Sequence, residues 1–108
     1  MANTWVTDLR HFLTASGALA EMPGPAFNLA CFQGSIAAWV TSPAGGVSYR
    51  TNVPCRRRPK GKRCPGEIEA ELVDGAQTVD WCCPICGDNG VIRGWQDTLW
   101  DRRRVGGG

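Results

Sequence analysis

The chain of 108 residues predicts an α+β fold in which an N-terminal helical segment packs against a small three-stranded β unit. Three observations support this prediction. A run of turn-forming residues at 42–46 divides the chain. Apolar residues recur at helical spacing before that run and alternate with polar residues after it. Five of the six cysteines also follow it, so we expect the β unit to carry the site that stabilises the fold.

The residues before the turn-forming run are predicted to form helices. A short helix is expected over 7–13, and a longer one over 25–40. Pro25 suits the first turn of the second helix, and the wide apolar surface of that helix needs a partner. The residues expected to be buried against the rest of the protein are Phe27, Leu29, Ile36 and Val40.

The residues after the run are predicted to form strands. Apolar and polar residues alternate over 47–53, which predicts a strand that leads into the first cysteine of this half. Alternation over 67–72, a turn signal at 74–75 and a second apolar run at 78–82 predict a hairpin. A strand over 91–95 completes the three-stranded unit.

The sharpest local motif is Cys83-Pro84-Ile85-Cys86-Gly87. Two thiolates separated by two residues can bind one tetrahedral zinc ion, because the intervening turn brings both sulfurs to one side. Cys55 and Cys64 supply a second pair, since the eighteen residues between Cys64 and Cys83 match the spacing of zinc ribbons. The sequence therefore predicts one structural zinc ion, although iron suits the same four thiolates. The predicted metal ligands are Cys55, Cys64, Cys83 and Cys86.

The spacing of the upstream pair differs from that of an ordinary zinc knuckle. Eight residues separate Cys55 from Cys64, where a knuckle has two to four, so the upstream half is expected to be a loop clamped by the metal. Other arrangements stay open at this point. They are a site that recruits Cys82 or His11, bridged thiols, and cysteines without a ligand role. For Cys31 we expect a small buried hydrophobic residue.

The alternation within the hairpin separates Cys83 from its neighbour Cys82. Even positions face inward over 68–72, and odd positions face inward over 79–81. Cys83 continues the inward face, and Cys82 is expected to point the other way.

The loop between Cys55 and Cys64 is strongly basic. It carries six of the twelve Lys and Arg residues of a chain whose net charge is +2. We interpret it as a phosphate-binding surface for nucleic acid, with Trp95 or Trp100 stacking on a base. In the alternative interpretation, the metal thiolates and the acidic residues of 67–71 balance the loop internally, and the large side chains of Trp81, Trp95 and Trp100 fill the core. The cations of the loop are Arg56, Arg57, Arg58, Lys60, Lys62 and Arg63.

No feature of the sequence indicates an enzyme. Four cysteine ligands leave a metal no open position, and no cluster of serine, histidine and carboxylate is visible, so no small-molecule substrate is expected. A protein–protein adaptor is the alternative to nucleic-acid binding. A thiol redox protein is the third hypothesis, but glycines at 87, 90 and 94 interrupt the helix that such a dithiol motif needs.

A wider pattern surrounds the last two cysteines. It runs Trp81-x-Cys83-Pro84-x-Cys86-Gly87-Asp88-Asn89-Gly90-x-Ile92-x-Gly94-Trp95, followed by Thr98-x-Trp100-Asp101. This pattern resembles a family of short uncharacterised bacterial proteins. Residues 55–58 and 7–13 also look like that family, so the resemblance covers most of the chain. It implies a zinc-ribbon fold and no particular activity.

The sequence also predicts where the protein is located and how the chain is divided. Residues 1–10 lack a basic leader before an apolar segment, and polar residues interrupt the apolar stretch 27–40, so we expect a cytoplasmic protein without a membrane span. We divide the single compact domain into an N-terminal helical segment at 1–46 and a zinc-ribbon module at 47–101. A disordered basic and glycine-rich tail is expected at 102–108.

Overall fold

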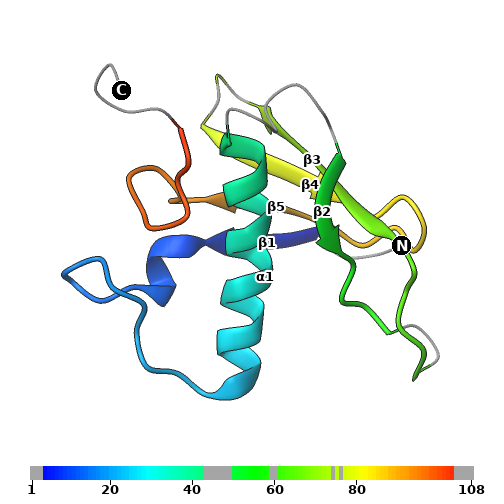
Figure 1. The fold of residues 1–108 in the computed structure, drawn as a ribbon, viewed down its shortest axis with the longest axis horizontal. Coiled ribbons are helices and arrows are strands. Elements are labelled where there is room, and N and C mark those ends of the chain that lie inside the picture. The colour runs from blue at the N-terminus through cyan, green and yellow to red at the C-terminus, as the bar shows by residue number, and fades with distance from the viewer. Residues whose placement is uncertain (1–3, 43–49, 59–60, 74, 76, 104–108) are drawn as a thin grey trace.

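The computed structural model describes residues 4–42, 50–58, 61–73, 75 and 77–103. Its strands form one sheet in the order β1-β5-β4-β3-β2, and α1 packs across one face of that sheet (Figure 1). The α+β class is therefore confirmed, but the sheet has five strands instead of the three predicted. The elements are β1 (Thr4–Asp8), the 3-10 helix η1 (Leu9–Phe12), α1 (Gly24–Thr41), β2 (Arg50–Pro54), β3 (Glu67–Val73), β4 (Thr78–Cys82) and β5 (Asn89–Arg93).

The N-terminus contributes a strand that the sequence analysis did not predict. β1 pairs in parallel with β5, with Trp5 opposite Gly90 and Asp8 opposite Arg93. The helix expected over 7–13 is reduced to η1, which the Asp8 side chain caps by accepting from the Arg10 N–H at 3.0 Å. Pairing with a strand 85 residues away overrides the local helical pattern here, and the β-branched residues of β1 favour that outcome.

The other strands follow the predicted pattern with shifted ends. β3 and β4 form the expected antiparallel hairpin, with Ala70 opposite Trp81 and Leu72 opposite Val79. β5 begins and ends two residues before the predicted strand at 91–95. β2 matches the second half of the strand predicted over 47–53, and residues 47–49 lie outside the described part of the chain.

The helix predicted over 25–40 is confirmed, with Pro25 in its first turn. At its other end, the Thr41 hydroxyl donates to the Ala37 carbonyl at 2.8 Å. Ile36 and Val40 are buried as expected, but the Phe27 side chain is 43% exposed. The helix is apolar on most of its circumference, so periodicity alone could not tell which side faces the sheet. The buried residues are Ala30, Gln33, Gly34, Ile36, Ala37, Val40 and Thr41.

Gly34 allows the C-terminal segment to pack directly on α1. A Cβ atom at this position would overlap the indole ring of the buried Trp100. Alanine in a helix normally stabilises by about 1 kcal/mol relative to glycine, whereas overpacking costs roughly 1–3 kcal/mol. We therefore expect Gly34→Ala to lower the free energy of unfolding by about 1 to 2 kcal/mol in a denaturant titration.

Gly24→Ala is the matched control for that prediction. Gly24 lies in the same helix, and a Cβ atom added there would have no neighbour within 4 Å. Only the difference in helix propensity between glycine and alanine then remains, so this variant should be as stable as the wild type or slightly more stable. Stabilisation by Gly34→Ala would show that Trp100 does not pack on the helix as described.

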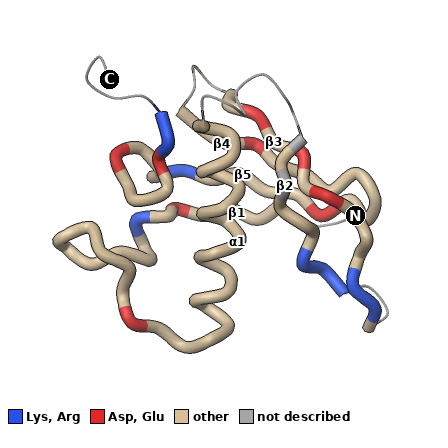
Figure 2. The backbone as a smooth tube through the Cα atoms, in the orientation of Figure 1, with Lys and Arg blue, Asp and Glu red and all other residues tan. Residues whose placement is uncertain are grey.

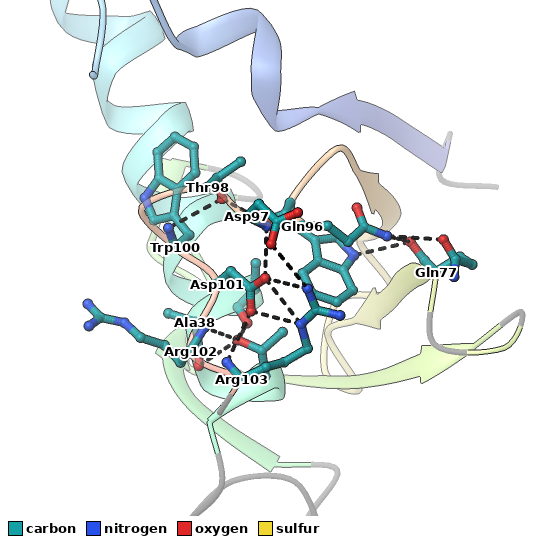
Figure 3. A network of polar contacts seen from close by, with 12 residues as sticks. Ala38, Gln77, Gln96, Asp97, Thr98, Trp100, Asp101, Arg102 and Arg103 are labelled. Carbon is teal, nitrogen blue, oxygen red and sulfur yellow. Dashed lines mark hydrogen bonds and ion pairs between the residues drawn. The ribbon is translucent and has the colours of Figure 1, made fainter. Parts of the chain in front are cut away.

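The C-terminal segment is anchored up to Arg103 (Figure 3). The Arg103 guanidinium pairs with the Asp101 carboxylate at 2.7 Å and lies 4.7 Å from the centre of the Trp95 ring. The Arg102 N–H donates to the Thr41 hydroxyl at 2.9 Å. Residues 102 and 103 of the tail that we expected to be disordered thus make defined contacts, and 104–108 lie outside the described residues.

The two faces of the sheet differ in chemistry. The face under α1 is apolar, with Ile68, Val79 and Ile92 fully buried. The opposite face carries acidic side chains of β3 and β4, and Glu71 lies directly opposite Asp80. Of the helices that the structure describes, none is both long enough and apolar enough to cross a lipid bilayer.

Candidate metal centre

Four cysteines from separate parts of the sheet come together at one end of it. Cys55 directly follows β2, Cys64 precedes β3, Cys83 directly follows β4, and Cys86 lies in the turn before β5. Their Sγ atoms all lie within 4.8 Å of one another. Three of the four are buried and Cys86 is half-buried. These are the four residues that the spacing singled out, and together they can hold a metal ion.

The distances between the sulfur atoms suit a tetrahedral metal. The Sγ atoms of Cys55 and Cys86 are 3.7 Å apart, and those of Cys64 and Cys83 are 3.6 Å apart. A tetrahedron with metal–sulfur bonds of about 2.3 Å has edges of about 3.8 Å. The thiols are too far apart for disulfide bonds, which need about 2.05 Å, and all are free.

The backbone supplies hydrogen bonds to the sulfur atoms in a repeated pattern. The N–H of the residue two positions after each cysteine donates to its sulfur, and for Cys64 the donor is Gly66 at 3.4 Å. Such bonds stabilise thiolates and orient them toward a metal. The upstream pair therefore uses the same turn geometry as the downstream pair, despite its long loop. The other three donors are Arg57, Ile85 and Asp88.

Two glycines make room for this arrangement. Gly87 has a φ angle of +80°, which lets the chain turn after Cys86, and its N–H donates to the Cys83 carbonyl at 2.9 Å. Gly66 has a different role, because a Cβ atom there would overlap the Cys83 sulfur. Gly66 was not singled out from the sequence, where only its place two residues after Cys64 could have indicated it.

The four thiols are unequal as acids. Burial raises the pKa of Cys55 to about 12 and also raises the pKa of Cys86. Burial acts on Cys83 too, but the N–H groups of Cys86 and Ile85 donate to its sulfur, and the net effect lowers the pKa of Cys83. Buried thiolates crowded together repel one another, so the cluster needs a cation to become fully ionised.

The remaining cysteines and the histidine lie outside the cluster. Cys82 is exposed on the acidic face of the sheet, where burial and the carboxylates of Glu69 and Asp80 raise its pKa. Its position confirms the predicted alternation in the hairpin. His11 is exposed on η1. Cys31 is exposed on α1, so the prediction that it is buried is wrong.

The basic loop lies between the first two cysteines and is fixed at both ends. The Cys64 N–H donates to the Arg57 carbonyl at 2.8 Å, and the Gly61 N–H donates to the Arg58 carbonyl at 3.1 Å. The loop extends beyond the end of β2 (Figure 2). Pro59 and Lys60 lie outside the described residues. The described cations are all exposed, and they are Arg56, Arg57, Arg58, Lys62 and Arg63.

Few of these cations are neutralised within the chain. Over the described residues, the only ion pair of the loop joins Arg57 to Asp88 at 3.4 Å. The glutamates of β3 form no ion pair with the loop in the same part of the structure. This arrangement disagrees with the alternative in which β3 balances the loop.

The two tryptophans assigned to base stacking lie in the core. Trp95 is fully buried, and its Nε1 donates to the Gln77 carbonyl at 3.2 Å. Trp100 is 9% exposed and packs on Gly34. Because a buried ring offers no face to a base, we propose no stacking role for either residue. Trp5, which the sequence analysis did not consider, is 51% exposed and close to the loop.

Comparison with known proteins found no matching family model, curated protein or solved structure. The resemblance of 81–101 to a bacterial family therefore stays a prediction.

Proposed function

We propose that the protein is a zinc-binding, non-enzymatic module that binds nucleic acid through the basic loop at 56–63. One observation carries this proposal: exposed cations, mostly without ion pairs in the described residues, lie between two cysteines of the metal cluster. The metal would hold both ends of the loop, so the cations would be pre-ordered for a polyanion.

The metal half of the proposal rests on the donor set. Four thiols at tetrahedral spacing, with N–H groups that donate to their sulfurs, suit zinc. Zinc has no redox chemistry, so it suits a purely structural site. Four thiolates complete the coordination of the ion and leave no position for water or substrate, which supports a structural role. Six free cysteines also suit a reducing compartment, and we propose the cytoplasm.

The salt dependence of binding tests the part of the proposal in which the basic loop binds nucleic acid. Each phosphate that the protein neutralises adds about 0.7 to 0.9 to the slope of log affinity against log salt. Changing both Arg58 and Lys62 to glutamine should therefore flatten the slope by about 1.4 to 1.8 while the metal content stays constant. Fluorescence anisotropy with mixed-sequence oligonucleotides at several salt concentrations measures the slope.

The control removes the same charge elsewhere. Arg93 and Arg102 are both exposed and lie outside the loop, so a variant with glutamine at both positions should keep the wild-type slope. Equal flattening by both double variants would mean that net charge, and not the loop, determines binding. Absence of salt-sensitive binding by the wild type at low ionic strength would contradict the proposal.

A protein–protein adaptor is the second candidate, and a specific feature of α1 favours it. Phe27 and Trp39 both belong to α1 and are 43% and 37% exposed. Large apolar side chains on a surface often contact another protein. If nucleic acid does not bind, loss of a partner on changing Phe27 and Trp39 to serine would support the adaptor.

A further inference from the structure

A pocket of about 210 Å³ lies where five segments meet: the start of β1, the N-terminal part of α1, the first residues of the basic loop, β4 and the turn before β5. Its apolar walls include Trp5, Leu29, Phe32 and Trp81. It is smaller than pockets for drug-sized ligands, which measure about 300 to 1,000 Å³, but has room for one planar ring system.

The rings that line the pocket lie beside cations. The Phe32 ring meets the Trp81 ring edge to face at 5.5 Å, and the Arg56 guanidinium lies 5.7 Å from the centre of Phe32. Trp5 is half exposed, and its Nε1 donates to an Asp88 oxygen at 3.2 Å. An exposed indole next to a guanidinium is the combination that single-strand binding proteins use to stack bases and to hold the backbone.

The charge at the pocket favours an anion. Arg56 and Arg57 both line it, and the carboxylate of Asp88 offsets one of them through its ion pair with Arg57. Arg56 forms no ion pair among the described residues, and it faces the aromatic wall. One positive charge is therefore left for a phosphate at the side of the rings.

Two buried polar atoms on the residues of this pocket have no partner. They are Gln33 Oε1, an acceptor, and Trp81 Nε1, a donor, and within the described residues no other buried side-chain nitrogen or oxygen lacks a hydrogen bond. Folded proteins rarely leave such groups unpaired, because the loss of water is not compensated. An acceptor and a donor on neighbouring side chains match the edge of a nucleobase, which presents both kinds of group.

Gly90 fixes the position of the Trp81 donor. A Cβ atom at residue 90 would lie 2.6 Å from Trp81 Nε1, so the indole rests directly on the β5 backbone. Because both unpaired atoms are covered by their neighbours, a base edge can reach them only after a small rotation of Gln33 or Phe32.

We propose that this pocket holds one base of a single-stranded nucleic acid, stacked on Trp5, with an adjacent phosphate on Arg56. The inference rests on the proposed function and specifies the form of nucleic acid that the loop would bind. The metal cluster supports the pocket, because Arg56 and Arg57 follow Cys55 and because the Asp88 carbonyl accepts from the Cys83 N–H at 2.7 Å.

The test compares oligonucleotides that carry the same charge with and without bases. The zinc-loaded protein is titrated with a labelled single-stranded octamer of mixed sequence, in DNA and RNA forms, and with an abasic octamer. Stacking of one base predicts at least about fivefold tighter binding of the base-bearing strands. Trp5→Leu should abolish this difference. Trp39→Leu, which removes another half-exposed indole outside the pocket, should preserve it.

A second variant separates recognition from folding. Gln33→Met keeps the length of the side chain and removes the unpaired acceptor, so the thermal midpoint should rise by about 4 °C. The same change should reduce the preference for bases at least about twofold. A lower midpoint would show that Gln33 Oε1 has a partner in the free protein, which would contradict its proposed role as an acceptor for the base.

Each remaining outcome decides a separate point. Equal binding of base-bearing and abasic strands, with a wild-type salt slope, would reject the pocket and keep the loop as a nonspecific phosphate site. If the protein binds free nucleoside monophosphates but no oligonucleotide, single-stranded nucleic acid is not the ligand of the pocket. That result would also reject the proposed function. Preference for duplex over single strand would also overturn the pocket, because paired bases cannot enter it.

Discussion

Replacing Cys83 with serine is expected to release the metal and unfold the protein. The free energy of binding structural zinc is about 10–16 kcal/mol in small zinc domains, whereas a whole domain is stable by only about 5–15 kcal/mol. Cys83 is 1% exposed and directly follows β4, so its loss affects both the cluster and the sheet. Metal analysis of the purified variant and far-ultraviolet circular dichroism measure the two effects.

Two further serine variants test whether the loss of any thiol, and not only the loss of a metal ligand, has this effect. Cys82 adjoins Cys83 but lies on the opposite face of the sheet, and Cys31 lies on α1. Both are exposed, and neither belongs to the cluster. Cys82→Ser and Cys31→Ser should keep the metal and the wild-type spectrum. Loss of metal from Cys82→Ser equal to that from Cys83→Ser would overturn the ligand assignment.

Gly66→Ala is expected to destabilise the protein and to weaken its metal site, although residue 66 is not itself a ligand. A Cβ atom at Gly66 would overlap the Cys83 sulfur and lie 3.1 Å from the Ile85 Cβ. One ligand must then move, or the turn that carries the N–H donor to Cys64 must shift. Overpacking of this kind costs roughly 1–3 kcal/mol, and a displaced ligand should weaken metal binding by at least about tenfold.

The exposed neighbour Pro65 provides the comparison for this variant. Pro65→Ala changes the same turn without adding an atom near the sulfur, so the metal should be kept. Competition with a chromophoric chelator measures the affinity of each protein. If Gly66→Ala holds the metal as tightly as Pro65→Ala does, the close contact between residue 66 and Cys83 is not a feature of the molecule in solution.

The cysteine cluster was predictable because its signals are local. Two spacings and the alternation over 68–72 and 79–81 were enough to separate Cys83 from Cys82, and the structure brings the four chosen thiols together. Alternation in a hairpin with one buried face is strongly specified, since a slip of one residue would expose the core. The helix at 25–40 was also predictable, from its proline start and its length.

Features that depend on distant pairing were not predictable. β1 becomes a strand only because β5 offers it an edge, and no property of residues 4–8 indicates that partner. The exposure of Trp5 was not predictable for the same reason. Trp95 and Trp100 lie in the core through contacts with Gln77 and Gly34, whereas Trp5 stays half exposed on the edge strand.

The mass of the folded protein tests the central claim most directly. Native mass spectrometry of protein purified without chelator should give the mass of the chain plus one zinc ion, and removal of that ion should unfold the chain. One bound iron would keep the cluster and contradict the choice of metal. A folded protein with the mass of the bare chain and six free thiols would contradict the account that a metal clamps the basic loop.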